Sequence, residues 1–152
     1  MEINELQRRP DNDRYKKLSS RYDSLEKLIS ALKDKDIPSE IVDSVNKHVE
    51  YINSFEGSDK DLSKQLLKAQ SKILELVEKE LKLVPKNHYR NLWLAIGMAV
   101  FGLPMGAAFG LGLDNMAFIG IGLPMGMLIG MAVGSEMDKK ARQKGRQLDL
   151  EI

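Results

Sequence analysis

The sequence lacks several residue types and motifs on which common enzyme chemistry depends. It contains no cysteine, which excludes disulfide bonds, thiol nucleophiles and thiolate metal ligands. Its two histidines, His48 and His88, lie far apart in the sequence, and His48 has no second histidine at the spacing of a zinc motif. No glycine-rich loop is followed by the Lys-Ser/Thr pair of a phosphate-binding loop. We therefore expect no enzyme, no catalytic residue, no metal and no cofactor.

Net charge is also nearly absent. The 23 lysines and arginines are balanced by 22 acids, which leaves a net charge of +1 and gives no case for nucleic-acid binding. The opening residues, MEINELQRRPDNDRY, are polar and contain no apolar region typical of a secretory signal. One long segment of the chain is also almost free of charged residues. Between Arg90 and Glu136, Asp114 is the only formally charged residue.

This apolar stretch predicts a transmembrane helical hairpin in residues 86–135. A hydrocarbon core about 30 Å thick is crossed by about 20 helical residues, so the stretch is too long for one crossing and suits two. We expect the spans at 92–113 and 116–133, with the apex at Asp114 and Asn115. The alternative is that the apolar stretch forms the buried core helices of a soluble domain. However, a chain of this size buries too little surface to cover two charge-free helices on all their faces.

The glycines of the hairpin follow a regular spacing. Residues four apart share one face of a helix, and small residues allow close helix packing in lipid. The predicted packing glycines are Gly102, Gly106 and Gly110 on the first span and Gly122, Gly126, Gly130 and Gly134 on the second. Gly97, Ala108, Gly112 and Gly120 lie off this face and predict a second contact, with neighbouring chains.

An internal repeat relates the two spans. The segment FGLPMGAAFG at 101–110 aligns with IGLPMGMLIG at 121–130, which indicates two copies of one structural unit. Each copy contains a proline that removes a backbone donor and clashes with the preceding turn. We therefore expect matched kinks at Pro104 and Pro124, at about the same depth.

The pattern WLAIGMAVFG, the GLPMGxxxG units, the Asp-Asn apex and the charged tail resemble those of small bacterial membrane proteins called glycine-zipper proteins. The resemblance covers about residues 91–152. It implies close helix packing and a bacterial inner, or cytoplasmic, membrane. It leaves the long N-terminal part unexplained.

The residues that flank the spans predict an orientation. Aromatic rings favour the membrane interface and cations favour the cytoplasmic side. The predicted lipid-interface residues are Tyr89, Arg90, Trp93, Lys139, Lys140 and Arg142. Because the apex has no lysine or arginine, both termini are expected in the cytoplasm. Asp114 and Asn115 are expected to form the turn and to cap the second span.

The rest of the chain predicts a cytoplasmic helical bundle at 13–85 after a loose polar arm at 1–12 that contains Pro10. A stripe of Tyr15, Leu18, Tyr22, Leu25, Ile29 and Leu32 indicates a helix from about Asp13. A second helix carries Ile41, Val45, Val49 and Ile52 and ends near Gly57, a left-handed cap. A third begins after Ser58, continues through Val84 and stops at Pro85. These helices form either an antiparallel bundle or a long hairpin completed by another copy.

The basic tail at 136–152 is expected to stay helical for about two turns and to loosen at Gly145. The alternation of Leu148, Leu150 and Ile152 with acids suits a strand added to a partner's sheet. Disorder is the favoured expectation for so short an end.

The overall expectation is an all-α, non-enzymatic, homo-oligomeric integral membrane protein. In it a glycine-packed hairpin carries a helical docking or regulatory domain, with membrane lipid as a partner. Its sharper form is a gated pore with an apolar lining. One alternative is a membrane-tethered adaptor that binds a soluble protein partner through residues 13–84. The other is a holin-like permeabiliser.

Overall fold

The computed structural model describes residues 2–9 and 16–151, and most of these are helical. The chain divides into two compact units. The first comprises the residues through Val84 together with Leu148–Leu150, and the second comprises Pro85–Gln147 together with Glu151. Pro10, Tyr15 and the expected helix start at Asp13 lie outside the described residues.

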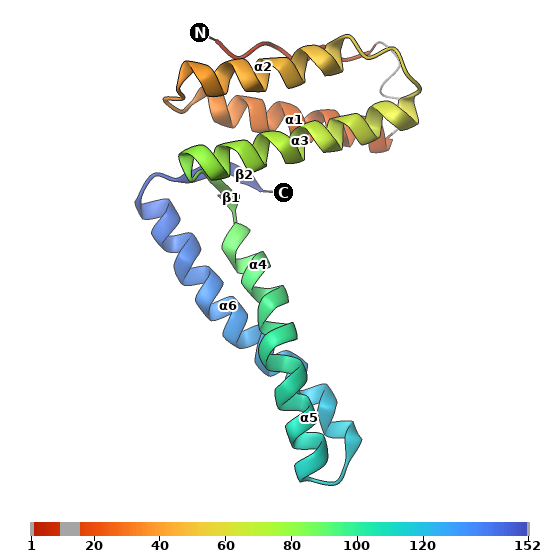
Figure 1. Cartoon of the computed structure of the whole chain (residues 1–152), viewed down its shortest axis with the longest axis vertical. Coiled ribbons are helices and arrows are strands. Elements are labelled where there is room, and N and C mark those ends of the chain that lie inside the picture. The colour runs from red at the N-terminus through yellow and green to blue at the C-terminus, as the bar shows by residue number, and fades with distance from the viewer. Residues whose placement is uncertain (1, 10–15, 152) are drawn as a thin grey trace. The chain divides into compact units, whose positions relative to one another are not determined.

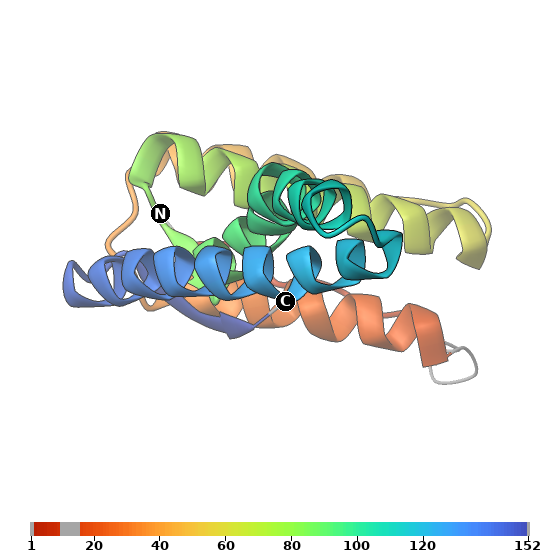
Figure 2. The ribbon, with the colours of Figure 1, turned by 90° about the horizontal axis from the view of Figure 1, so that it is seen from below.

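The first unit is a three-helix bundle of α1 (Lys16–Lys33), α2 (Ser39–Asn53) and α3 (Asp59–Leu81) (Figure 1). Helices α1 and α3 begin at the same end of the bundle, and α2 runs in the opposite direction (Figure 2). Of the two architectures that the sequence left open, the chain forms the bundle. The predicted stripes supply its core, with Leu18, Tyr22, Leu25, Ile29, Leu32, Ile41, Val45, Val49, Ile52, Leu62, Leu66, Ala69, Ile73 and Val77 all buried.

Helix α3 begins as predicted and ends earlier than predicted. The Ser58 hydroxyl accepts the backbone N–H of Asp61 at 3.2 Å and donates to the Asp61 carboxylate at 2.7 Å, which confirms the cap. The hydrogen bond from the Ser58 hydroxyl to the carboxylate and the nearby Lys64 ammonium hold the pKa of Asp61 below its usual value. The helix ends at Leu81 because Lys82 adopts a left-handed conformation with φ 58°. Val84, expected on the helical stripe, belongs to a strand.

The predicted end of α2 is wrong in its detail. The helix ends at Asn53, and the C-cap is Ser54, whose backbone N–H donates to the carbonyl oxygen of Glu50 at 2.9 Å. Gly57 has no positive φ and therefore is not a left-handed cap. The chain has already left the helix four residues before it, so no left-handed residue is needed there.

The polar arm is not loose where the structure describes it. Residues 2–9 lie along α2 because Asn46 and Asn53, two turns apart on one helix face, each bond their backbone. Asn46 Oδ1 accepts the N–H of Asn4 at 2.7 Å, and Asn53 Oδ1 accepts the N–H of Gln7 at 2.8 Å. The side chain of Ile3 is buried in the core. The expectation of a loose arm is therefore wrong for this segment.

The C-terminal end is also ordered. Strand β2 (Gln147–Glu151) pairs with β1 (Val84–Lys86) in a two-stranded sheet. The alternation predicted from the sequence places Leu148 and Leu150 in the core of the first unit. The strand does form, and it pairs with β1 of the same chain. The favoured expectation of disorder is thus wrong, because burial of the two leucines and pairing with β1 both favour the ordered strand.

The second unit consists of two long helices. The first comprises α4 (His88–Gly97), the π-helical segment η2 (Met98–Gly102) and α5 (Leu103–Gly112) without a break. After a turn, the 3-10 segment η3 (Met116–Phe118) leads into α6 (Ile119–Gln143). The helices have 25 and 28 residues and are long and apolar enough to cross a membrane, since 25 residues span about 37 Å. As predicted, helix continues about two turns past Ser135, and Gly145 ends the run with φ 68°.

Candidate functional site

The most distinctive feature of the second unit is the contact between its two long helices, which is made through glycine. The residues predicted to pack, Gly102, Gly106, Gly110, Gly122, Gly126, Gly130 and Gly134, are all buried. A Cβ built on Gly122 would lie 2.5 Å from the Cα of Gly106, and one on Gly106 would lie 2.5 Å from the carbonyl oxygen of Ile119. Backbone therefore meets backbone. Glycine is the residue that permits this approach, because any side chain would separate the helices.

Gly97 belongs to the same contact, although its five-residue spacing from Gly102 predicted that it would lie off the inner glycine face. A Cβ on Gly97 would lie 2.8 Å from the Cα of Gly130. Gly97 precedes Gly102 by five residues, and the intervening η2 segment is π-helical. Because a π-helical turn contains one more residue than an α-helical turn, a spacing of five keeps both glycines on one face. The expectation that Gly97 faces neighbouring chains is therefore wrong.

Gly112 and Gly120 lie outside this contact, as expected. A Cβ on either residue would meet nothing within 4 Å. Ala108 is also exposed. These three small residues leave space on the outside of the helix pair.

The two prolines are accommodated differently. Pro104 lies in the first turn of α5, directly after the π-helical η2, whereas Pro124 lies inside α6. Gly102 and Gly122 contact each other, and each proline follows its glycine by two residues on helices that run in opposite directions. Pro104 and Pro124 thus lie on either side of this crossing and not directly opposite each other. The kinks themselves stay a prediction.

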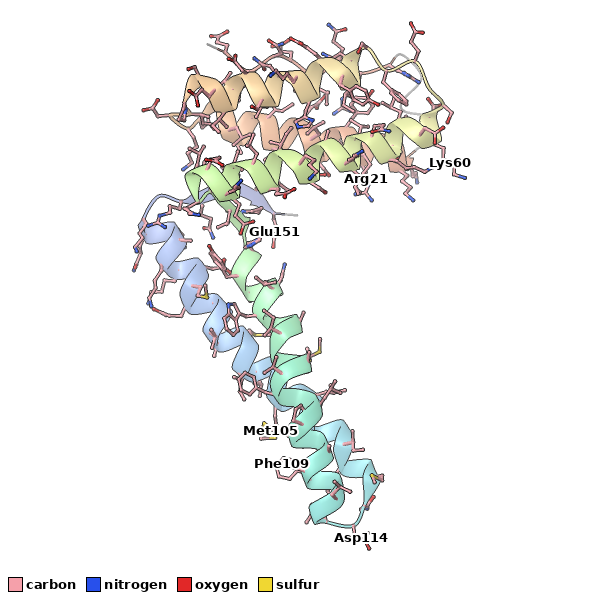
Figure 3. The ribbon with its side chains drawn as sticks, in the orientation of Figure 1. Arg21, Lys60, Met105, Phe109, Asp114 and Glu151 are labelled. Carbon is pink, nitrogen blue, oxygen red and sulfur yellow. The ribbon has the colours of Figure 1, made fainter. Side chains whose placement is uncertain are left out.

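The apex is a turn of Leu113, Asp114 and Asn115 between α5 and η3, and it includes the two residues that the sequence indicated (Asp114 is labelled in Figure 3). Asp114 has φ 50°, a left-handed conformation that aspartate tolerates. Asn115 is the N-cap of η3, and its side-chain oxygen accepts the backbone N–H of Ala117 at 3.0 Å. The turn therefore satisfies a free donor at the start of the second helix.

At the other end of the pair, Asp138 connects the helices. Its carboxylate accepts the backbone N–H of Tyr89 at 3.1 Å and that of Arg90 at 2.9 Å, and the residue is 8% exposed. Asn87, the N-cap of α4, makes no side-chain capping bond, so α6 supplies the anion that the first turn of α4 favours. Sequence reasoning missed this residue. The sequence does contain a signal for it, because Asp138 follows Gly134 by four residues and so continues the face that the packing glycines share.

Replacing Asp138 with alanine is expected to lower the free energy of unfolding of the helix pair by about 2 kcal/mol, because two charge-assisted bonds to partly buried amides are lost. Asp138→Asn should lose about half as much, since one oxygen remains. The measurement is unfolding in mixed micelles, followed by the fluorescence of Trp93, the only tryptophan. Glu136→Gln, at an exposed position two residues away, is the control. Equal effects of the Asp138 and Glu136 variants would contradict the capping role.

The predicted interface residues lie at this same end. Tyr89 and Arg90 are joined to Asp138, and Lys139, Lys140 and Arg142 follow it in α6 with exposed side chains. Trp93 is partly exposed, and its backbone lies against Gly130. The cations of the pair are therefore concentrated at the end away from Asp114.

The outward surface of the pair is apolar. Val100, Leu103, Leu111 and Leu128 are 54–72% exposed, and Met105 and Phe109 also project from the first helix (Figure 3). In the most apolar windows of the two helices, only 22% and 17% of the residues are buried. A soluble protein usually buries most of its large apolar side chains, whereas both helices of this pair leave them exposed over much of their length.

Comparisons with protein-family models, with curated proteins and with solved structures each find no match.

Proposed function

We propose that the chain is a non-enzymatic, homo-oligomeric integral membrane protein, in which the helix pair crosses the bacterial inner membrane and the N-terminal bundle lies in the cytoplasm. The observation that carries this proposal is the burial pattern of the pair, in which glycine fills the contact between the helices and large apolar side chains such as Leu111 and Leu128 are exposed. Exposed apolar surface of this extent has a high free energy in water and a low one in hydrocarbon. In lipid, close backbone packing replaces apolar burial as the source of helix association.

The orientation follows from the distribution of charge. Arg90, Lys139, Lys140 and Arg142 lie at one end of the pair, and the turn at the other end has only Asp114. Under the positive-inside rule the cationic end faces the cytoplasm. An aspartate at a turn outside the hydrocarbon core avoids the insertion cost of at least about 2.5 kcal/mol that applies at the centre of a span.

Self-association is proposed through the outward small residues Ala108, Gly112 and Gly120. The contact between the two spans already occupies the other glycine face, so a neighbouring copy needs a different one. Such an assembly has apolar surfaces throughout. A pore lined by side chains such as Met105 and Phe109 dewets and closes readily, which favours a gated lesion or a scaffold over an ion-selective channel.

The test is cysteine labelling in cells, for which no native cysteine of the chain has to be replaced. Asp114→Cys is expected to react with an impermeant maleimide added outside the inner membrane. Lys47→Cys in α2 should react only after permeabilisation. Native mass measurement of the complex extracted in lipid should give a multiple of the chain mass. Full-length protein that stays soluble without detergent would overturn the proposal, and an apex reached only from inside would reverse the orientation.

A further inference from the structure

The helical bundle contains a groove at the end where α1 and α3 begin. Its volume is about 720 Å³, within the usual range for small-molecule sites. Arg21 of α1 and Lys60 of α3, both labelled in Figure 3, line it. All of its lining residues belong to the first unit, and the membrane proposal makes no use of any of them.

Among the described side chains that line this groove, cations outnumber acids. Lys17, Arg21, Lys60 and Lys64 line it with one acid, Asp59. The Asp59 carboxylate lies 3.4 Å from the guanidinium of Arg9, and the Lys64 ammonium lies 3.1 Å from the carboxylate of Asp61.

The other three cations have no such counter-ion. Across residues 2–9 and 16–151, the structure pairs neither Lys17, Arg21 nor Lys60 with a carboxylate within 4 Å. Three cations around one groove thus attract an anion.

The groove also has an apolar wall. Leu18 is buried beneath it, and Leu67 is 40% exposed, so the Leu67 side chain offers apolar surface to a ligand. The aliphatic stems of the lysines extend this surface. The amide of Asp61 in the first turn of α3 is already bonded to Ser58, and the side-chain cations supply the formal positive charge of the groove.

We propose that this groove binds an amphipathic oxyanion, meaning one phosphate or carboxylate group joined to a short apolar chain. The guanidinium of Arg21 offers the paired donors that suit an oxyanion, and Lys17 and Lys60 supply further positive charge. The apolar chain lies against Leu67. This inference goes beyond the proposed function and stands independently of it, because the groove belongs to the helical bundle alone.

The experiment uses the full chain in nanodiscs of neutral lipid, with empty nanodiscs as the blank. Octyl phosphate below its micelle concentration is titrated by calorimetry, and inorganic phosphate and octanol are titrated separately. Octyl phosphate is expected to bind saturably and at least about tenfold more tightly than phosphate, because the chain buries apolar surface. Hydrogen exchange should slow at the first turns of α1 and α3 when it binds.

Matched variants localise the site. Arg21→Gln and Lys60→Gln should each weaken octyl phosphate binding by about tenfold, whereas Lys68→Gln, the same charge change at an exposed position of α3 outside the groove, should not. Leu67→Ala should weaken octyl phosphate binding and leave phosphate binding unchanged. Equal affinity for phosphate and octyl phosphate would overturn the amphipathic ligand in favour of a free oxyanion. The proposed site would be contradicted if octyl phosphate showed no saturable binding, or if Arg21→Gln and Lys60→Gln left its binding unchanged.

Discussion

Replacing Gly126 with leucine is expected to disrupt the packing of the two apolar helices and to lower the free energy of unfolding of the pair by about 3 kcal/mol. A Cβ at this position would lie 2.5 Å from the backbone nitrogen of Gly102 and 2.7 Å from its Cα. The backbone cannot move aside as a flexible side chain can, so the helices must separate. Leucine favours the helical state over glycine by about 1 kcal/mol, which is too little to offset the clash.

The control for Gly126→Leu is Gly120→Leu in the same helix. A Cβ on Gly120 meets nothing within 4 Å, so this variant should keep the gain in helix propensity and unfold no more easily than the parent chain. Both are measured by detergent-induced unfolding in mixed micelles with Trp93 fluorescence. Equal destabilisation by the two variants would contradict the assignment of Gly126 to the inner face. A smaller complex for Gly120→Leu alone is the result expected if neighbouring copies use the outer face.

Leu148→Ala is expected to destabilise the helical bundle, although residue 148 lies far from it in the sequence. Leu148 is 0% exposed and belongs to the bundle core, and truncating a buried leucine costs about 3 kcal/mol. The effect should be seen as faster hydrogen exchange across α1, α2 and α3 in the full-length protein. Leu67→Ala, at 40% exposure, is the control and should cost less than about 1 kcal/mol. Unchanged exchange in Leu148→Ala would show that β2 is not part of the core.

The sequence predicted the helices well because their signals are local. Apolar residues three and four apart mark the faces of α1, α2 and α3, and each predicted position among the described residues of α1 and α2 is buried. The Ser58 cap and the Asp114–Asn115 turn depend on neighbouring residues only. Such features need no knowledge of what packs against them.

The errors occur where a distant segment decides the outcome. Residues 2–9 are ordered by Asn46 and Asn53, and β2 is ordered by β1 and the bundle core. Neither segment would be ordered by its own composition, which is why both were expected to be loose. Asp138 was overlooked for the same reason, since its partners are backbone amides of α4 that no side-chain motif reveals.

The amino-acid sequence by itself determined that two charge-poor helices with glycine at intervals of four follow a charged helical region, because composition and periodicity are properties of the local chain. The tertiary structure decided which glycines meet. A π-helical turn at Met98–Gly102 brings Gly97 onto the inner face. The spacing of the residues does not reveal whether a helical turn is hydrogen-bonded as a π-helix or as an α-helix. It also decided that the final strand returns to the first unit, because burial of Leu148 and Leu150 needs a core that only the folded bundle supplies.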